Sequence, residues 1–407
     1  MIKTVFKPVT DDIIKIPASK SEVHRLLICA ALSDKATKIF CDGTNEDIEA
    51  TAECLRALGA EIIYNDKAFT VEPIRDVPEN PVLSCNESGS TLRFLLPLAS
   101  FFGKDTVFVT KGRLGDRPLS PLKEELEAAG VKITKENGEI RLSGSCSRTS
   151  FSIEGNVSSQ FASGLIFLLT KTGGEIEITG TSESRPYIEM TIDALRQFGC
   201  SISFSGNRIS VAKTAPLISP EKVSAGGDWS NSAFFLSAGL IGKKAITLTG
   251  LYADSVQGDK KIVDILREFG GRIEIGEKGI TAYPSSLRGI ALDARDIPDL
   301  VPVLSVVAAN AEGTTEIKSC GRLRLKESDR IEAVYNMIKN LGGKIRVEND
   351  SIIIEGSALR GGSVDAVNDH RIAMSAATAA FCTEGAVTVN GAEAVKKSYP
   401  SFWDEIR

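Results

Sequence analysis

The sequence predicts an α/β fold with two domains, each built from three copies of one unit of about 70 residues. Three observations lead to this prediction. The chain has 407 residues, which is long for a single hydrophobic core. A short alternating strand that ends in glycine recurs six times, at intervals of 68 to 71 residues. A helix that ends in glycine and leads into another strand recurs five times, at intervals of 69 to 72 residues.

The first repeated element is predicted as a strand because apolar and polar residues alternate in it, as in "EIEITG". Its closing glycines are Gly43, Gly112, Gly180, Gly250, Gly321 and Gly391. The second element has a helical pattern that stops at a glycine, as in "LRQFGCSI". It begins at Leu55, Leu126, Leu195, Leu266 and Ile338. With a second, more apolar helix ahead of each glycine-ended strand, every copy is expected to contain two helices and their strands.

The sixth copy is cut short, because the chain stops after "AEAVKKSYPSFWDEIR" without a returning strand. The first segment, "TVFKPVTDDIIKIP", alternates like a pair of strands. We therefore expect residues 1–18 to complete the last copy. Division into three copies each gives predicted domains of residues 19–225 and of residues 226–407 plus 1–18, with the crossing near "SAGGDWS".

Composition favours a globular protein that acts on small molecules. Apolar residues make up 42% and charged residues 25%, and no run approaches the roughly 18 apolar residues of a membrane helix. The first twelve residues contain no hydrophobic signal region, so a cytoplasmic protein is expected. A net charge of −5 argues against bulk nucleic-acid binding. Eight scattered cysteines are expected to be reduced, buried apolar side chains.

Histidine usage nearly excludes a histidine metal site or a Ser-His-Asp triad. The chain has only His24 and His370, and each is followed by an arginine, a pattern closer to anion binding. The nucleotide-binding patterns GxxxxGK[ST] and GxGxxG are both absent. We therefore expect no metal and no cofactor.

Basic residues recur at one place in the repeat. Five residues after the glycine stand Arg117, Arg185, Lys326 and Lys396, with Lys397 adjoining the last. If the second helix starts there, each cation opposes the helix dipole at a cost of a few tenths to about 1 kcal/mol. A solvated surface charge is the alternative at any one position. The recurrence favours a ligand with several negative charges.

Other helix starts carry polar groups suited to an anion. "NESGSTLRF" places Gly89 at a helix start with Arg93 one turn inside, and "GNVSSQF" places Ser158, Ser159 and Gln160 before an apolar helix. Helix capping is the alternative for the serines. In "LKESDR", Lys326 and Arg330 are expected on one helix face, with Glu327 paired to Arg330, although an exposed ion pair would give the same pattern.

The stretch "IPASKSEVHRLL" places Lys20, Ser21 and Arg25 at the start of an apolar helix. Arg25 enters the apolar side, where an unpaired charge is costly. Glu22 is the only acidic residue within reach along that helix. These residues therefore predict that the helix start holds an anionic ligand, whereas His24 is expected to be a packing residue.

The motifs "SKSxxxR", "SGSTLR", "GDRPL", "SSQ", "SRPY", "IPD", "LKESDR" and "NDHR" stand in this order along the whole chain. As an ordered set they closely resemble the 5-enolpyruvylshikimate-3-phosphate synthase family. The resemblance implies a pair of inside-out α/β barrels with the active site in the cleft between the domains. It implies transfer of the enolpyruvyl group of phosphoenolpyruvate to the 5-hydroxyl of shikimate 3-phosphate, with release of phosphate. It implies no cofactor, and we expect a monomer that binds neither nucleic acid nor membrane.

The resemblance also implies roles for individual residues. Asp299 accepts the proton of the 5-hydroxyl, Glu327 protonates the methylene carbon, and Lys20 reaches both substrates. The residues implied for shikimate 3-phosphate are Lys20, Ser21, Arg25, Ser158, Ser159, Gln160, Ser184, Asp299 and Lys326. Those implied for phosphoenolpyruvate are Lys20, Gly89, Arg117, Gln160, Arg330, Arg371 and Lys397.

Two departures from the family pattern affect these roles. Arg322 stands where many members have asparagine, and Glu87 and Ser88 replace the more usual asparagine and alanine. The main alternative is the sister enzyme that uses UDP-N-acetylglucosamine, but its usual loop cysteine corresponds here to Gly112. A non-catalytic binding protein on the same scaffold is a second alternative, although both catalytic carboxylates are present.

Overall fold

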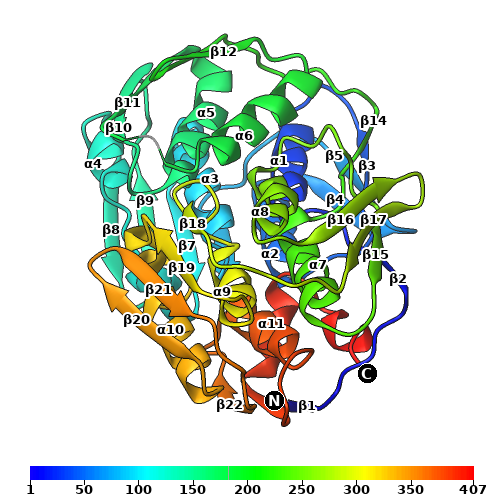
Figure 1. Cartoon of the computed structure of the whole chain (residues 1–407). Coiled ribbons are helices and arrows are strands. Elements are labelled where there is room, and N and C mark those ends of the chain that lie inside the picture. Colours follow the sequence, from blue (N-terminus) through cyan, green and yellow to red (C-terminus); the bar gives the residue numbers. More distant parts are fainter. Residues whose placement is uncertain (182) are drawn as a thin grey trace. The chain divides into compact units, whose positions relative to one another are not determined.

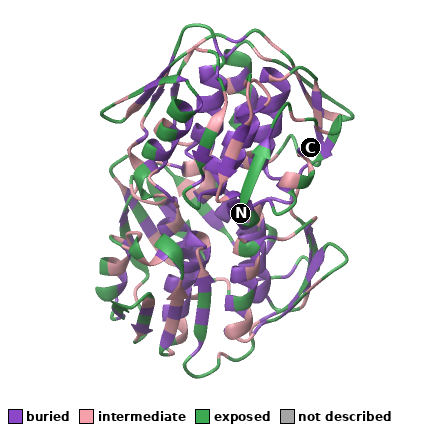
Figure 2. Ribbon diagram, turned by 90° about the horizontal axis from the view of Figure 1, so that it is seen from below, coloured by how far each residue is buried: buried purple, intermediate pink, exposed green. Residues whose placement is uncertain are grey.

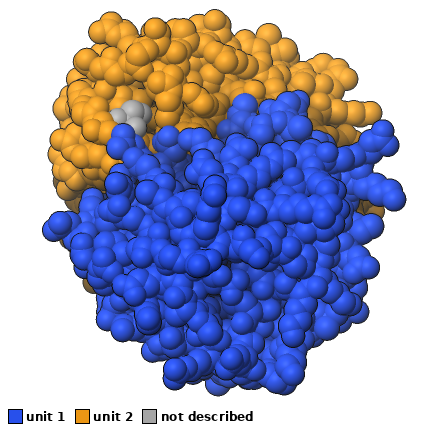
Figure 3. All heavy atoms as spheres, in the orientation of Figure 1, with its two compact units in different colours: residues 1–17, 226–407 blue, residues 18–225 orange. Residues whose placement is uncertain are grey.

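The computed structural model describes residues 1–181 and 183–407, and its helices and strands are labelled in Figure 1. The chain divides into two compact units (Figure 3). Unit 1 contains Met1–Pro17 and Gly226–Arg407, and unit 2 contains Ala18–Ala225. The first crossing therefore falls one residue before the predicted position, between Pro17 and Ala18.

Unit 2 contains the first three copies of the repeat. Its elements are α1 (Lys20–Ala31), β3 (Thr37–Phe40), α2 (Glu46–Ala57), β4 (Glu61–Asn65), β5 (Ala68–Glu72), β6 (Val82–Asn86), α3 (Gly89–Phe102), β7 (Thr106–Thr110), η1 (Gly112–Asp116), α4 (Leu122–Glu127), β8 (Lys132–Glu136), β9 (Glu139–Ser143), β10 (Ser150–Glu154), α5 (Ser159–Thr172), β11 (Gly174–Thr179), α6 (Arg185–Gln197), β12 (Ile202–Ser205), β13 (Arg208–Val211) and β14 (Lys222–Ser224).

Unit 1 contains the other three copies. Its elements are β1 (Ile2–Val5), β2 (Ile13–Lys15), α7 (Trp229–Ile241), β15 (Ile246–Thr249), η2 (Gly258–Lys261), α8 (Ile262–Glu268), β16 (Arg272–Gly276), β17 (Gly279–Tyr283), β18 (Ala291–Asp293), α9 (Val301–Ala309), β19 (Thr314–Lys318), η3 (Gly321–Leu325), α10 (Arg330–Asn340), β20 (Lys344–Glu348), β21 (Ser351–Glu355), β22 (Gly362–Asp365), α11 (His370–Ala379), β23 (Val387–Asn390), η4 (Ala392–Lys397) and η5 (Phe402–Asp404).

Each copy forms a small sheet around its glycine-ended strand. In the second copy β6 runs parallel to β7, β7 pairs antiparallel with β9, and β8 completes the hairpin. The sheets in unit 2 have the orders β6-β7-β9-β8, β10-β11-β13-β12 and β14-β3-β5-β4. Because β14 from the end of unit 2 pairs with β3 of its first copy, the three copies close on themselves.

The N-terminal segment differs in part from the prediction. Strand β1 pairs antiparallel with β23 and so completes the last copy, as expected. Strand β2, however, pairs in parallel with β15 and belongs to the sheet of the fourth copy. The two strands therefore close unit 1, because β2 is the parallel partner of β15 in its first copy and β1 is the antiparallel partner of β23 in its last copy.

The apolar helix of each copy lies inside its unit, whereas the second helix and the sheet are partly exposed. In unit 2 the apolar helices α1, α3 and α5 are almost wholly buried, whereas strands such as β3 alternate between buried and exposed residues (Figure 2). This is the inside-out arrangement implied by the resemblance. Helix packing is close: a Cβ on Gly164 of α5 would lie 2.2 Å from the carbonyl oxygen of Arg93 in α3. Each buried leucine or phenylalanine contributes about 1.5–3 kcal/mol.

Candidate active site

The recurring basic residues do not share the position predicted for them. Arg185 begins α6, but Arg117 follows the 3-10 helix η1, Lys326 follows η3 and Lys396 lies within η4. In the second and fifth copies a 3-10 helix begins at the repeat glycine and delays the second helix, and in the sixth copy η4 stands in its place. The prediction that these cations oppose the dipole of the second helix is therefore wrong for three of the four residues. Arg185 itself pairs with Glu189 of its own helix at 2.9 Å, on the exposed surface.

The start of α1 gathers the residues of the first motif in unit 2. Ser19 caps the helix by accepting a hydrogen bond from the amide of Glu22 at 3.4 Å. Lys20 is the first helical residue, and its Nζ lies 2.9 Å from Asp47 Oδ2 of α2. The backbone carbonyl of Ser21 accepts a hydrogen bond from Arg25 Nη1 at 2.6 Å. A basic cluster therefore lies at the mouth of this helix.

Arg25 is buried among neutral hydrogen-bond acceptors. Its Nε donates to Thr191 Oγ1 at 2.8 Å, and its Nη2 donates to the carbonyl of Tyr187 at 2.8 Å, both in α6. Its guanidinium also lies over the Phe94 ring, 4.9 Å from the centroid. Burial lowers the pKa of Arg25 to about 10, so the group remains cationic at neutral pH. A buried cation among neutral acceptors is a place where a bound anion is stabilised.

Gly89 lies in a cradle of guanidinium groups at the start of α3. A Cβ on Gly89 would lie 2.7 Å from Arg117 Nη1 and 2.8 Å from Arg93 Nη1. Arg93 Nη1 donates to Gln160 Oε1 at 2.9 Å, and Gln160 Nε2 donates to Ser90 Oγ at 3.0 Å. The predicted residues Gly89, Arg117 and Gln160 therefore lie together. Two cations and a helix N-terminus make this cradle suitable for a phosphate or carboxylate.

The predicted serines lie at two further helix starts of unit 2. Ser158 caps α5 and accepts a hydrogen bond from the amide of Gln160 at 3.3 Å. Ser159 is the first residue of α5 and is buried. Ser184 precedes α6 in a left-handed conformation with φ of 56°, and it is also buried. Capping, the alternative considered for these serines, is therefore observed for Ser158, whereas no side-chain cap bond is formed by Ser184.

In unit 1 the predicted carboxylate Asp299 lies just before α9, within a ring of cations. Its Oδ1 accepts from Arg330 Nη1 at 2.7 Å and lies 3.9 Å from Lys326 Nζ, and its Oδ2 accepts from Arg371 Nη2 at 3.3 Å. Burial raises the pKa of Asp299, but Arg371, Lys326 and Arg330 outweigh burial and hold the pKa well below its usual range. Asp299 is therefore a charged acceptor that balances a dense positive cluster.

Arg330 is the centre of this cluster and is 1% exposed. It donates to Asp299, to Glu327 Oε2 at 2.8 Å, and twice to Asp369, through Nε at 2.8 Å and Nη2 at 3.3 Å. Among the described residues, these four hydrogen bonds use four of its five N–H groups. The predicted pairing of Glu327 with Arg330 is confirmed. Lys326, however, does not share a helix face with Arg330, because α10 begins only at Arg330.

Arg371 differs from Arg330 because it is buried and under-satisfied. Its side chain is 3% exposed, and it lies over the Phe234 ring at 6.0 Å. Among the residues that the structure describes, its Nε and Nη1 have no hydrogen-bond partner. Leaving buried charged donors unpaired costs about 1–3 kcal/mol or more for each. The geometry therefore provides donors for an anionic group next to Asp299.

Lys397 and Arg322 also lie in unit 1. Lys397 is 5% exposed, and its Nζ donates to the carbonyl of Asn368 at 2.7 Å. Burial, together with the neighbouring charges of Arg322 and Arg330, lowers the pKa of Lys326 to about 8, although Asp299 and Glu327 oppose the shift. Arg322, the departure from the family pattern, therefore lies close enough to Lys326 to weaken its charge.

Sequence reasoning missed two buried carboxylates near Asp299. Asp369, in the quoted "NDHR" motif, is fully buried, caps α11 through the amide of Arg371 at 2.9 Å, and accepts from Ser328 Oγ at 3.0 Å. Its position directly before a helix was the available signal. Asp259, in "QGDK", is buried and accepts a hydrogen bond from Ser230. Burial and the Asp299 charge raise the pKa of Asp259 to about 7.

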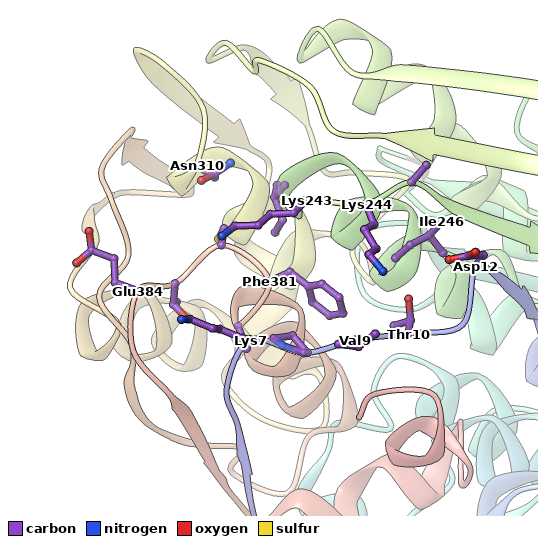
Figure 4. A pocket seen from close by; sticks show the side chains of 16 residues that line it. Lys7, Val9, Thr10, Asp12, Lys243, Lys244, Ile246, Asn310, Phe381 and Glu384 are labelled. Atoms are coloured by element: carbon purple, nitrogen blue, oxygen red, sulfur yellow. The ribbon is translucent and has the colours of Figure 1, made fainter.

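No predicted site residue lines the apolar-walled cavity drawn in Figure 4. This cavity has a volume of about 540 Å³ and lies in unit 1, where Ile241, Ile246 and Phe381 meet Lys243 and Lys244 (Figure 4). Within residues 1–181 and 183–407, no group of three or more His, Cys, Asp or Glu side chains is arranged to hold a metal ion. No helix in that same part of the chain has the length and hydropathy needed to cross a membrane.

Comparisons with known proteins agree over almost the whole chain. A family model described as EPSP synthase (3-phosphoshikimate 1-carboxyvinyltransferase) matches residues 6–406. A relative from Clostridium kluyveri, named 3-phosphoshikimate 1-carboxyvinyltransferase, is 41% identical over 401 residues, covering 97% of this chain and 94% of the relative. The protein of the same name from Clostridium acetobutylicum is 40% identical over 404 residues, with the same coverage of 97% and 94%.

Solved structures show the same architecture. EPSP synthase from Acinetobacter baumannii matches with a TM-score of 0.80 and 25% identity, covering 99% of this chain and 96% of that one. The enolpyruvyl transferase NikO from Streptomyces tendae matches with a TM-score of 0.79 over 100% of this chain and 98% of that one. At 19% identity, NikO supports the fold alone.

Proposed function

The chain belongs to the EPSP synthase family, and on this premise we propose how its residues divide the reaction. It is an enolpyruvyl transferase of the shikimate pathway, which leads to the aromatic amino acids. It transfers the enolpyruvyl group of phosphoenolpyruvate to the 5-hydroxyl of shikimate 3-phosphate and releases phosphate. The residue roles that follow are proposals.

We propose a set of phosphoenolpyruvate-binding groups in each unit. In unit 2 these are the Gly89 cradle with Arg117 and Gln160, together with Lys20. In unit 1 they are Arg371, Lys397 and the remaining N–H of Arg330. The observation that carries this proposal is the buried guanidinium of Arg371, whose Nε and Nη1 have no partner among the described residues. A phosphate or carboxylate would satisfy both.

Shikimate 3-phosphate is assigned to the remaining polar groups. In unit 2 these are Lys20, Ser21, Arg25, Ser158, Ser159, Gln160 and Ser184, and in unit 1 they are Asp299 and Lys326. The buried Arg25 with its neutral acceptors supports a phosphate near the start of α1. Hydroxyl and amide groups at the starts of α5 and α6 suit the sugar-like hydroxyls, because they donate and accept without adding charge.

The chemistry proceeds by addition and elimination. Glu327 gives a proton to the methylene carbon of phosphoenolpyruvate, and C2 becomes electrophilic. The 5-hydroxyl oxygen adds to C2 as its proton passes to Asp299, which gives a tetrahedral intermediate. Loss of the phosphate group and of a methyl proton then restores the enol ether. Exclusion of water prevents hydrolysis at C2.

Substrate binding also solves a difficulty with Asp299. A carboxylate whose pKa is held well below its usual range by Arg371 and Lys326 is a weak base. An anion bound to Arg371 neutralises part of that positive field, and the pKa of Asp299 then rises toward its working range. We propose that Asp299 becomes an effective base only when phosphoenolpyruvate is bound.

The alternative acceptor, UDP-N-acetylglucosamine, is opposed by the position of Glu87. The loop cysteine usual in that sister enzyme corresponds to Gly112, and a Cβ there would lie 1.6 Å from Glu87 Oε1. Gly112 also has a φ of 52°, which disfavours any side chain. No cysteine can occupy this place without moving Glu87.

Phosphate release from phosphoenolpyruvate by the purified protein tests the acceptor. Release is expected with shikimate 3-phosphate and not with UDP-N-acetylglucosamine, and dependence on the UDP-sugar would overturn the assignment. Asp299→Ala and Glu327→Ala are expected to cut turnover by about two to four orders of magnitude while substrate binding is largely kept. Comparable turnover in either variant would contradict its assigned role.

We also propose that the enzyme works as a monomer in the cytoplasm. Its eight cysteines are all free, and seven of them are buried, which suits a reducing compartment. Light scattering coupled to size exclusion should give a mass close to 43.5 kDa. A mass of twice that value would contradict the monomer.

A further inference from the structure

His24 begins a buried chain of hydrogen bonds that crosses three helices of unit 2. His24 Nδ1 in α1 lies 2.6 Å from Thr51 Oγ1 in α2, which lies 2.6 Å from Thr91 Oγ1 in α3. Thr91 Oγ1 in turn donates to Ser88 Oγ at 2.7 Å. All four residues are fully buried. The chain therefore links the start of α1 to the residue directly before Gly89.

The direction of these bonds follows from counting protons. Thr91 donates its hydroxyl proton to Ser88, so toward Thr51 it can only accept. Thr51 then donates its own proton to Thr91 and accepts from His24. His24 is thereby fixed as the neutral tautomer with its proton on Nδ1. Burial lowers the pKa of His24 well below its usual value, and the nearby cations Lys20 and Arg25 act in the same direction, so the imidazole is neutral.

Keeping a histidine here has a cost. His24 Nε2 is buried, and it has no hydrogen-bond partner within the described part of the chain. An unsatisfied buried acceptor is unfavourable, and a leucine of similar size would avoid it. A residue selected for packing alone would therefore not be a histidine. This indicates that the hydrogen bond from Nδ1 to Thr51 has a role.

This chain of hydrogen bonds ends at Ser88, next to the Gly89 cradle. Ser88 caps α3 by accepting from the amide of Thr91 at 3.3 Å, and it adopts an extended conformation just before Gly89. Since Gly89 lies against the guanidinium groups of Arg93 and Arg117, a small rotation at Ser88 would misplace the first amides of α3 relative to those cations. Binding of a phosphate or carboxylate there depends on such alignment.

We propose that His24 is a positioning residue for phosphoenolpyruvate, which acts through Thr51 and Thr91 to hold Ser88 and the Gly89 cradle in place. This rests on the proposed binding of phosphoenolpyruvate at Gly89. It assigns to His24 no contact with either substrate. It also gives the two neighbouring residues separate roles. The hydrogen bonds of His24 lead to α2 and α3, whereas the side chain of Arg25 donates to α6.

Steady-state kinetics of three variants test the proposal. His24→Leu removes the donor, His24→Asn keeps an N–H at the place of Nδ1, and Thr51→Val breaks the chain in its middle with little change of shape. His24→Leu and Thr51→Val are each expected to raise the KM for phosphoenolpyruvate roughly tenfold, with the KM for shikimate 3-phosphate within twofold of wild type. His24→Asn is expected to restore the KM for phosphoenolpyruvate.

The double variant His24→Leu/Thr51→Val should be no worse than either single variant, because each breaks the same chain. Unchanged KM for phosphoenolpyruvate in folded Thr51→Val overturns the proposal, as does an equal rise in both KM values, which would indicate general loosening. Arg117→Ala distinguishes a failure of the proposed phosphoenolpyruvate site at Gly89 from a failure of the positioning role of His24. If it leaves the KM for phosphoenolpyruvate unchanged, the binding assignment at Gly89 is wrong; if it raises this KM while the chain variants do not, only the role of His24 is wrong.

Discussion

Replacing Arg371 by methionine is expected to damage function without damaging the fold. Arg371 is 3% exposed, it makes one hydrogen bond of 3.3 Å to Asp299, and its Nε and Nη1 have no partner among the described residues. Methionine keeps an unbranched apolar chain over Phe234. The variant therefore removes two donors proposed for phosphoenolpyruvate together with a buried charge that the fold does not fully satisfy.

The structure gives the size and sign of both effects. Two charge-assisted hydrogen bonds to an anion are worth about 1.5–3 kcal/mol each, so their loss should lower kcat/KM for phosphoenolpyruvate by roughly two to four orders of magnitude. Stability should stay level or rise, because Asp299 keeps its 2.7 Å bond from Arg330 and two unsatisfied donors disappear. Arg371→Lys keeps the positive charge but loses the planar pair of N–H donors, so an intermediate loss of kcat/KM for phosphoenolpyruvate is expected.

Initial rates at varied phosphoenolpyruvate and saturating shikimate 3-phosphate measure the first effect, and thermal unfolding measures the second. Isothermal titration with shikimate 3-phosphate alone is the control, since Arg371 is not assigned to that substrate. The reasoning is refuted if kcat/KM for phosphoenolpyruvate changes less than threefold. It is refuted equally if Tm falls by more than about 5 °C, which corresponds to roughly 1–2.5 kcal/mol in a domain of this size, because Arg371 would then be a structural residue.

Three further predictions follow from the geometry. Lys326, with a pKa of about 8, is charged below that pH and neutral above it, so kcat/KM for shikimate 3-phosphate should fall as pH rises through 8. Lys326→Arg should move this fall in kcat/KM to a pH at least one unit higher. If the fall stays at the same pH in the variant, it belongs to another group. Gly164→Ala places a Cβ 2.2 Å from the Arg93 carbonyl oxygen and should destabilise unit 2 by about 1–3 kcal/mol, visible in urea unfolding; wild-type stability would show that α3 and α5 are less closely packed. Gly112→Ala should lower Tm by several degrees because its Cβ meets Glu87, and Glu87→Ala in the same chain should recover part of the loss; a single variant as stable as wild type would place Glu87 elsewhere.

The repeat was predictable because each of its signals is local. Alternation over four to six residues predicts the glycine-ended strands, and β3, β7, β11, β15, β19 and β23 all lie where the pattern places them. The glycine after each second helix adopts a left-handed conformation, with φ of 101° at Gly59 and 76° at Gly199. Only glycine takes such a conformation freely, so a glycine in the sequence directly predicts where the helix ends.

The start of the second helix was not predictable in the same way. In the second copy Pro118 and Pro121 lack amide donors, and α4 begins only at Leu122. Sequence spacing suggested a helix near Arg117, but the proline positions delay it, and the 3-10 helix η1 fills the interval. A proline count in the segment would have been a better signal than the spacing from the glycine.

The contacts of the site depend on distance along the chain. The pairing of Glu327 with Arg330 is three residues apart and was predicted, whereas the bonds from Arg330 to Asp369 join residues 39 apart and were not. Arg25 was expected to need a partner, and although one acceptor is the nearby carbonyl of Ser21, the other two lie in α6, more than 160 residues away. Sequence can show that a buried charge needs compensation, but the fold decides which residue supplies it.

The closure of unit 1 by its first strands fixes the order in which the protein can mature on the ribosome. All of unit 2 has been synthesised once residue 225 is made, and its ends lie beside the same strand, with Ala18 bonded to Asp42 and Ala225 to Phe40. Strand β1 must wait for β23, which is translated almost last. At roughly 5–20 residues per second, translation from β1 to β23 takes on the order of 20 to 80 seconds. During that time Val5, the buried apolar residue of β1, has no native strand partner, so the last sheet of unit 1 cannot be completed until translation is nearly finished.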